Sequence, residues 1–280
     1  MFPPGLGGRP PHVTTEAHFL PWFDDVMNRL LNLCDFVVAG ERYHFAELEA
    51  YYSGDAHPDL FAHRDPLQLE NARWYFHRTR GEYRGGSFKG LDLTMGDGKA
   101  FFGILIRTIV LDDESLIDGP SLTVDYLLSA TKAKNVAALD GMIAGRSIWD
   151  TTSPLHIAEA TEPRSATVHR TARVGLSLKK AAGKADAPKF VMRPYRYLTQ
   201  PRGISKGKVH LVIALHQRGE TTHAIHLLTG CPKKTIERYV ADFAAGKAIA
   251  AFDGYIGKDL GTADLCKLHG TWSVAHGSAT

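Results

Sequence analysis

A nearly unbroken apolar run is the feature that most constrains the fold of this chain of 280 residues. Phe101 to Leu111 reads Phe-Phe-Gly-Ile-Leu-Ile-Arg-Thr-Ile-Val-Leu, a pattern typical of a strand buried deep in a sheet. Arg107 interrupts the run, and burial of a guanidinium is costly unless a carboxylate and further acceptors meet it. The run therefore predicts a buried anion beside Arg107, unless Arg107 lies at a frayed strand end and extends to water.

The stretch Tyr43–Tyr52 supplies candidate anions. Read as a strand, it places Phe45, Glu47, Glu49 and Tyr51 on one face, with the two carboxylates about 6–7 Å apart because each residue rises about 3.3 Å. At that separation the carboxylates can share a cation, a water molecule or a substrate. The alternative is an edge strand whose glutamates face solvent.

Bulk properties limit what this strand can belong to. The apolar content of 44% fits one large domain, or one domain with a small appendage. No run approaches the roughly 18 apolar residues of a membrane span, and the N-terminus lacks the pattern of a secretory signal. We therefore expect no membrane partner and an intracellular location. The net charge of +3 permits a polyanionic partner.

Cysteine usage argues against stabilisation by disulfides. Cys34, Cys231 and Cys266 are odd in number, far apart and without a paired spacing. The sequence predicts neither a disulfide framework nor a zinc site.

Periodicity divides the first two thirds of the chain. Residues 1–15 are rich in Gly and Pro and predict an extended lead-in. Apolar positions recur at helical spacing from Phe19 to Cys34, with Pro21 near the expected start. Strands are expected at three further places besides the Glu49 segment: Phe36–Val38, Arg73–Arg78 and Phe101–Leu111.

Several short motifs occur in the order seen in one known family. They are Glu49-Ala50-Tyr51, Ala62-His63-Arg64, Trp74-Tyr75-Phe76-His77, Ile106-Arg107, Asp118-Gly119-Pro120-Ser121-Leu122, Ala172-Arg173-Val174-Gly175-Leu176 and Arg193-Pro194-Tyr195-Arg196-Tyr197-Leu198. In this order and spacing, between residues 36 and 200, the chain resembles the alkyladenine (3-methyladenine) DNA glycosylases. The resemblance implies a mixed α+β (α/β) fold with a curved, largely antiparallel sheet and surrounding helices, and a catalytic domain over residues 16–200.

The resemblance also implies roles for individual residues. Glu49 would activate the attacking water, while Arg107 and the main-chain carbonyl of Leu176 would help to hold that water. Neither a metal nor another cofactor is implied, and the matched catalytic positions carry no lysine. We therefore expect water as the nucleophile and an intact abasic site as the product.

The pocket for the extracted base is assigned in the same way. Tyr51 and His77 would form two of its walls, His63 would contact the base or the sugar-phosphate, and Asp92 would replace an asparagine of the relatives, with a one-residue gap. His77 stands where relatives usually carry tyrosine. Because His77 and Asp92 make the pocket more polar than usual, preference for alkylated purines cannot simply be carried over.

The segment 80–90 is basic, rich in glycine and carries aromatic residues, as expected for a loop that follows a nucleic-acid backbone. Arg80 occupies the position where relatives insert an aromatic wedge into the duplex. Arg84 and Lys89 are the other expected DNA contacts. The alternative is a solvated hairpin.

A second unit is expected over residues 201–280. Three short helices are predicted, at Lys208–Arg218, Thr222–Thr229 and Lys233–Phe243, and the glycine between the last two is typical of a helix-turn-helix. Pro232 suits the first turn of the third helix. The expected DNA contacts there are Lys233, Lys234 and Arg238, with Thr235 also exposed. The alternative is a three-helix bundle used for packing or dimerisation.

Three functions remain open from the sequence. The first is a monomeric DNA N-glycosylase for base excision repair, acting on a damaged or modified base in duplex or single-stranded DNA, in the nucleus or in a bacterial nucleoid. The second is a non-catalytic helix-turn-helix regulator with a glycosylase-like shell. The third is a metal-dependent hydrolase built from His44, Glu47, Glu49, His57 and His63.

Overall fold

The computed structural model of the protein describes residues 9, 10 and 12–277, and these divide into two compact units. Unit 1 comprises the described residues up to Pro58, Ala62–Val168 and Tyr197–Thr199. Unit 2 comprises Asp59–Phe61, His169–Arg196 and the described residues from Gln200 onward. Residues 1–8 and 11 of the expected lead-in lie outside the described part, whereas Val13 is buried.

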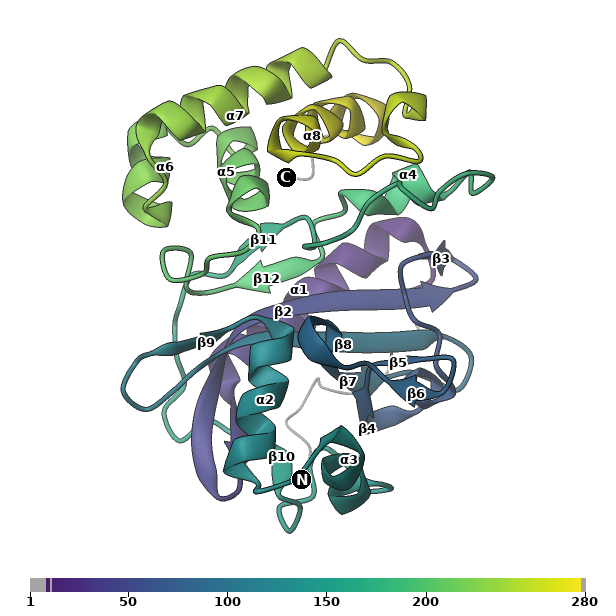
Figure 1. Cartoon of the computed structure of the whole chain (residues 1–280), viewed down its shortest axis with the longest axis vertical. Coiled ribbons are helices and arrows are strands. Elements are labelled where there is room, and N and C mark those ends of the chain that lie inside the picture. The colour runs from purple at the N-terminus through teal and green to yellow at the C-terminus, as the bar shows by residue number, and fades with distance from the viewer. Residues whose placement is uncertain (1–8, 11, 278–280) are drawn as a thin grey trace. The chain divides into compact units, whose positions relative to one another are not determined.

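Unit 1 is built on a curled, antiparallel half-barrel sheet with helices around it (Figure 1). The predicted mixed α+β class is therefore confirmed. The strands are β1 Cys34–Val38, β2 Glu41–Gly54, β3 His57–Pro58, β4 Asn71–Phe76, β5 Arg78–Thr79, β6 Glu82–Tyr83, β7 Leu91–Met95, β8 Phe101–Val110, β9 Leu116–Asp118 and β10 Leu155–Glu159. The helices are α1 Glu16–Leu33, α2 Pro120–Ala130 and α3 Val136–Ile143, with 3-10 turns η1 Pro66–Leu69 and η2 Gly86–Phe88.

The order of the sheet is β10-β1-β2-β8-β7-β4, with β3 paired to β2 and β9 paired to β8. The apolar run forms β8, which lies between β2 and β7 as its composition predicts. β2 lies between β1 and β8, so the alternative of a solvated edge strand is wrong.

Helix α1 packs on one face of this sheet through aromatic side chains. The ring centroids of Phe19 and Tyr52 are 4.8 Å apart, and those of Trp22 and Phe102 are 5.0 Å apart. Because strand side chains alternate, this packing assigns the even-numbered residues at this end of β2 and β8 to the core. The odd-numbered residues, Glu49 among them, belong to the opposite face.

The boundaries of α1 differ from the prediction. The helix begins at Glu16, three residues before Phe19. The carboxylate of Glu16 lies 3.0 Å from His57 Nδ1 on β3. This non-local contact explains the extra turn at the N-terminus and leaves Pro21 inside the helix. At the other end Cys34 is the first residue of β1.

Unit 2 contains the three predicted helices, as α5 Lys208–Gln217, α6 Thr222–Thr229 and α7 Lys233–Gly246. Gly230 ends α6 with φ +69°, a conformation that favours glycine. The other elements are β11 His169–Thr171, α4 Ala187–Val191, β12 Arg196–Leu198, which passes into unit 1 after Arg196, η3 Asp253–Tyr255 and α8 Thr262–His276.

Helix α8 was not predicted, and two glycines explain how closely it packs on α7. A Cβ atom at Gly246 would lie 2.0 Å from the carbonyl oxygen of Lys267, and one at Gly270 would lie 2.1 Å from that of Phe243. The two backbones can approach only because both positions lack a side chain.

The core of unit 2 unites residues on both sides of the boundary expected at residue 200. Leu178 and Met192 pack in one cluster with Leu268 and Trp272 of α8. Residues 169–196, which the sequence assigned to the catalytic domain, therefore share their core with the C-terminal helices.

Candidate active site

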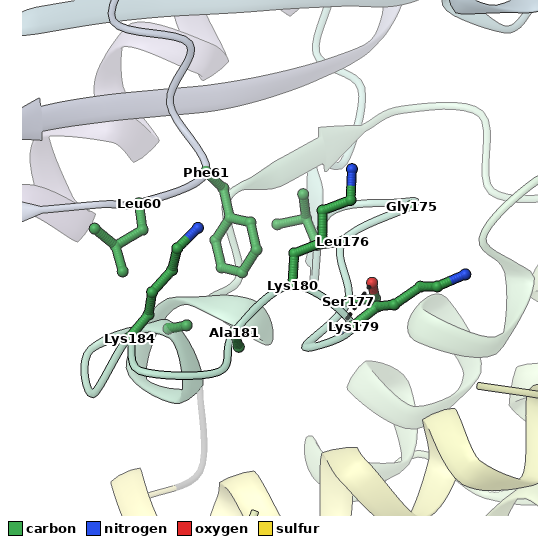
Figure 2. Close-up of a pocket in the computed structure, with 10 residues that line it drawn as sticks. Leu60, Phe61, Gly175, Leu176, Ser177, Lys179, Lys180, Ala181 and Lys184 are labelled. Atoms are coloured by element: carbon green, nitrogen blue, oxygen red, sulfur yellow. Dashed lines mark hydrogen bonds between the residues drawn. The ribbon is translucent and has the colours of Figure 1, made fainter. Parts of the chain in front are cut away.

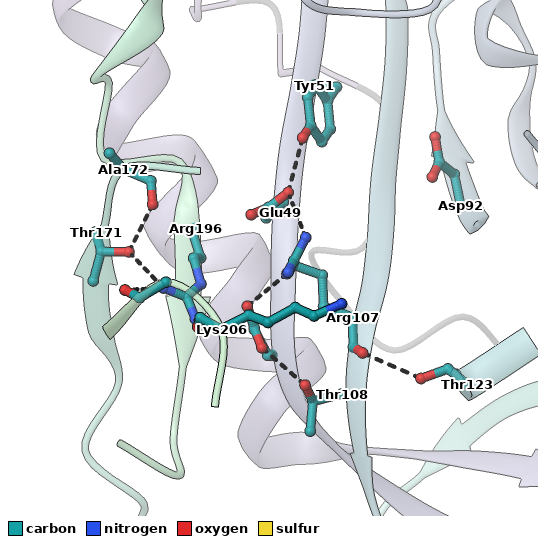
Figure 3. Close-up of polar contacts among 12 residues, drawn as sticks. Glu49, Tyr51, Asp92, Arg107, Thr108, Thr123, Thr171, Ala172, Arg196 and Lys206 are labelled. Atoms are coloured by element: carbon teal, nitrogen blue, oxygen red, sulfur yellow. Dashed lines mark hydrogen bonds and ion pairs between the residues drawn. The ribbon is translucent and has the colours of Figure 1, made fainter. Parts of the chain in front are cut away.

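Arg107 on β8 meets two buried carboxylates of β2 (Figure 3). Its Nε lies 2.6 Å from Glu47 Oε1, and its Nη1 lies 3.5 Å from Glu49 Oε2. Arg107 is 5% exposed, Glu47 1% and Glu49 0%. The predicted buried anion is confirmed, and the alternative of an arginine extending to water is wrong.

An irregular register on β2 brings both carboxylates to Arg107. The pairing with β8 shifts between Phe45 and Leu48, so that Glu47 pairs with Thr108. Thr108 Oγ1 donates a hydrogen bond of 2.8 Å to Glu47 Oε2. The backbone of Arg107 is fixed from its other side, because its carbonyl oxygen accepts from Gly119 N at 2.9 Å and Thr123 Oγ1 at 3.2 Å.

The two carboxylates stabilise the positive charge of Arg107. Burial lowers the pKa of Arg107, but the nearby charges of Glu49 and Glu47 outweigh that effect and raise it above its ordinary value. Arg107 therefore stays cationic.

Tyr51 completes this centre. Its hydroxyl donates a hydrogen bond of 2.8 Å to Glu49 Oε2, the oxygen that also faces Arg107 (Figure 3). Glu49 is thus oriented by a phenol and a guanidinium, which is the kind of support that fixes a reacting carboxylate.

The sheet face that carries Glu49 extends across β8 to Asp92 on β7. Leu105 of β8 pairs with Glu49 on one side and with Asp92 of β7 on the other, and Asp92 pairs with Tyr75 of β4. Residues directly opposite in antiparallel strands point to the same face. Gly103 leaves room for this arrangement, because a Cβ there would lie 2.4 Å from Asp92 Oδ2.

Asp92 is the centre of a second polar cluster. Its carboxylate, 1% exposed, accepts from Gln68 Nε2 at 3.0 Å and lies 2.7 Å from His77 Nε2. The rings of His63 and His77 are 4.2 Å apart edge to face, and His63 Nδ1 lies 3.3 Å from the hydroxyl of Tyr75. The structure therefore brings His63, His77 and Asp92 together.

Gln68 belongs to this cluster, although the sequence alone did not identify it. It sits on η1, where Asp65 and Gln68 form a capping box and Pro66 occupies the first turn. The Asp-Pro-x-Gln pattern is a recognisable start signal for a helical turn, so the turn was detectable. That Gln68 is completely buried and reaches Asp92 depends on the fold.

The titration of His63 gives a test of this cluster. Burial, assisted by His77, lowers the pKa of His63 from 6.5 to about 4. Below its ordinary pKa the unfolded chain binds a proton that the folded protein does not bind until about pH 4. The free energy of unfolding should therefore fall, by about 1–3 kcal/mol from this residue, as pH decreases from 6.5 toward 4.

The measurement is the melting temperature at several pH values for the wild type and for His63→Gln. The variant should lose part of the acid-induced decrease. His269 in unit 2, whose pKa burial also lowers to about 4, leaves a residual slope in both proteins. Identical pH profiles for the two proteins would contradict the assignment.

The expected DNA-contacting segment forms a short hairpin, β5–β6, followed by η2. Arg80 and Gly81 make its two-residue turn with φ +53° and +87°, so Arg80 is exposed at the tip. Arg84 Nε donates to Thr79 Oγ1 at 3.0 Å. Lys89 lies 2.8 Å from Asp125 on α2, so part of its charge is compensated locally.

The remaining predicted residues belong to unit 2. Leu176 lines a pocket in that unit, whereas Glu49 and Arg107 belong to unit 1. On α7, Lys233, Lys234 and Arg238 are exposed as predicted, whereas Thr235 is only partly exposed.

The side chains proposed for a metal site have separate partners. His44 Nδ1 lies 3.3 Å from Asp35, and His57 faces Glu16. His63 belongs to the cluster around His77. Within residues 9, 10 and 12–277, no three His, Cys, Asp or Glu side chains are arranged to hold a metal ion. The described helices include none long and apolar enough to cross a membrane.

Comparison with known proteins adds one relative. No known protein-family description matches the chain. Over an alignment 207 residues long, the chain is 30% identical to "Uncharacterized protein L759" of Acanthamoeba polyphaga mimivirus, and the match covers 68% of this chain and 91% of that protein. At this identity and coverage, the chain belongs to the same family as the mimivirus protein L759.

Proposed function

We propose that the protein is a DNA N-glycosylase, which extracts a damaged or modified base from DNA and hydrolyses its N-glycosidic bond with water activated by Glu49. The observation that carries the proposal is the completely buried Glu49, held by Tyr51 and Arg107 on the sheet face that also carries Asp92. The resemblance to alkyladenine DNA glycosylases supports the same assignment. The proposed substrate implies that the protein works where DNA is present. We propose that it acts as a monomer.

The chemistry requires few groups. As the glycosidic bond lengthens, the sugar gains positive charge, which a nearby carboxylate stabilises while it accepts a proton from the attacking water. Glu49 supplies that carboxylate. Arg107, shared with Glu47, neutralises part of the negative charge in this centre and fixes the position of Glu49.

The polar cluster around Asp92 suits a base that has been turned out of the stacked bases of DNA. Base extraction costs a few kcal/mol, recovered by stacking and by hydrogen bonds to the base edge. Tyr51 and His77 would supply the ring faces, and Asp92, which accepts a hydrogen bond from Gln68, lies 2.7 Å from His77 Nε2. Because His77 is tied to Asp92, we expect a base with hydrogen-bonding groups rather than a purely apolar lesion.

The experiment that tests the function uses oligonucleotides containing hypoxanthine, ethenoadenine, methylated purines, uracil or oxidised bases. Each is incubated with the protein as duplex and as single strand, and abasic sites are detected by cleavage in alkali. Alkali-dependent strand cleavage with at least one lesion is expected. Release of none of these bases by the folded protein would reject the proposal.

Helices α5, α6 and α7 give a specific reason to retain a second candidate, a non-catalytic DNA-binding regulator. Their arrangement in sequence is that of a helix-turn-helix, and the first residues of α7 are exposed and cationic. The two candidates differ in their dependence on Glu49: base release requires it, and DNA binding alone does not.

DNA binding by α7 is tested by its dependence on salt. Each lost phosphate contact reduces the slope of log affinity against log salt by about 0.9. The triple variant Lys233→Gln, Lys234→Gln and Arg238→Gln should therefore flatten the slope by about 2–3 in fluorescence anisotropy with duplex DNA. Substitution is preferable to truncation at residue 200, because removal of α8 would expose the core around Leu178.

The matched control is Glu237→Gln, which changes an exposed residue of the same helix. It should leave the slope of the wild type intact. If the triple variant keeps the same slope as the wild type, α7 does not contact phosphates.

A further inference from the structure

Unit 2 contains a pocket of about 260 Å³ (Figure 2). Its lining combines an apolar part with lysines and, among the described residues, includes no acidic side chain. The lining residues are Leu60, Phe61, Gly175, Leu176, Ser177, Lys179, Lys180, Ala181, Lys184 and Ala187. The chemistry proposed at Glu49 uses none of the side chains that line this pocket.

The aromatic part of the pocket is held in place by a buried ion pair. Asp59 Oδ1 accepts from the backbone N–H of Phe61 at 3.0 Å, and Asp59 Oδ2 lies 2.6 Å from Arg173 Nη1. Both charged side chains are 0% exposed. Arg173 Nη2 also donates to the carbonyl of Phe190 at 3.2 Å. The segment that carries Phe61 is therefore fixed before any ligand arrives.

The lysine-bearing side of the pocket is anchored by its apolar neighbours. Leu178 and Ala181 are buried in the core that includes Trp272 of α8, while Lys180 between them and Lys184 beyond are exposed. Their backbone positions are thus set by packing, although the ammonium groups remain in solvent.

The pocket carries an excess of positive charge. Lys179 Nζ lies 2.5 Å from Asp259, and both side chains are substantially exposed, so this pair is weak. Lys180 and Lys184 add two further positive charges around Phe61 (Figure 2). The pocket therefore favours an anion that also has an apolar or aromatic portion.

We propose that this pocket binds a phosphorylated nucleoside, with the base against Phe61 and the phosphate at Lys180 and Lys184. An aromatic ring stacks on any nucleobase, and lysine ammonium groups bind phosphate as point charges. A phosphate monoester carries a charge of about −1.5 to −2, which matches two lysines better than the single charge of a carboxylic acid does. The pocket volume suits one nucleotide rather than a base pair.

This chemistry has two possible sources, a free mononucleotide or the 5′-phosphorylated end of a nucleic-acid strand. Both present a base and a phosphate monoester on one sugar. The test separates them with four probes: dAMP, deoxyadenosine, and a single-stranded oligonucleotide with either a 5′-phosphate or a 5′-hydroxyl end.

Affinities are measured by isothermal titration calorimetry for the wild type and for the double variant Lys180→Gln and Lys184→Gln. The phosphorylated member of at least one pair should bind more tightly, and the double variant should weaken it about five- to thirtyfold. Binding of dAMP identifies a free nucleotide, and preference for the 5′-phosphorylated oligonucleotide identifies a strand end. The matched control is Lys258→Gln, an exposed lysine of unit 2 outside the pocket, which should leave each affinity unchanged.

Two results would overturn the proposal. One is the absence of any preference for the phosphorylated probes by the wild type, and the other is equal affinity in the double variant. Phe61→Leu adds a second arm, because it keeps an apolar side chain but should weaken the phosphorylated probe through lost stacking. Glu49→Gln should not affect these affinities, so failure here and failure of the proposed glycosylase activity are distinguishable.

Discussion

Glu49→Gln should reduce base release at least about a thousandfold, because it removes both the proton acceptor and the negative charge that faces the developing cation. The substitution is nearly isosteric. The amide oxygen can still accept from the hydroxyl of Tyr51, and Arg107 keeps its shorter contact of 2.6 Å with Glu47. Folding and DNA affinity should therefore be preserved. Single-turnover kinetics on the oligonucleotide found in the lesion panel measure the rate of release, and anisotropy measures binding.

The control for this variant is Glu41→Gln, which makes the same chemical change at an exposed position of the same strand. It should release the base at the wild-type rate. A Glu49→Gln protein that retains more than about a tenth of that rate would remove Glu49 from the general-base role, for which a contribution of about 10²–10⁴-fold is typical.

Arg107→Met should lower the free energy of unfolding by about 3–5 kcal/mol, since it leaves two carboxylates buried without their cation. Urea denaturation at pH 7 measures the change. Burial and mutual repulsion disfavour the charged form of such unpaired carboxylates in the folded variant. The variant should therefore regain stability relative to the wild type as pH falls, because protonation removes the buried charges.

The comparison for this prediction is Arg29→Met, which removes an arginine paired with Asp25 on the surface of α1. That pair is partly exposed, and its loss should cost less than about 1 kcal/mol. Combining Arg107→Met with Glu47→Gln should cost less than the sum of the single changes, because the two side chains are in direct contact. Additive effects, or an Arg107→Met protein as stable as the wild type, would contradict a tightly coupled centre.

Sequence patterns identified the elements whose formation depends on residues close together in the chain. The apolar run predicts β8, and helical spacing with Gly230 predicts α5 and α6 to within one residue, whereas α7 continues three residues beyond its predicted end. The need of Arg107 for an anion also proved sufficient to connect two distant segments, because burying an unpaired guanidinium is so costly that few arrangements satisfy it.

Other features depend on contacts between segments far apart in sequence. The local sequence around Gly246 and Gly270 does not show that another helix packs there. Together, however, the two glycines determine how closely α8 packs on α7. Likewise Gln68 reaches Asp92 only because the sheet places η1 beside β7. Local propensity does not encode such pairings, so they had to come from the three-dimensional structure.

The way the chain is shared between the two units has a consequence for synthesis. Asp59–Phe61 of unit 2 leaves the ribosome early, long before Arg173, with which Asp59 forms its buried ion pair. Conversely, unit 1 receives Tyr197–Thr199 only after residues 169–196 of unit 2 have been made. Unit 1 can therefore be completed only after residues 59–61 and 169–196 of unit 2 have been synthesised. No single cut in the chain separates the two units, so neither can be expressed whole as one continuous segment without part of the other.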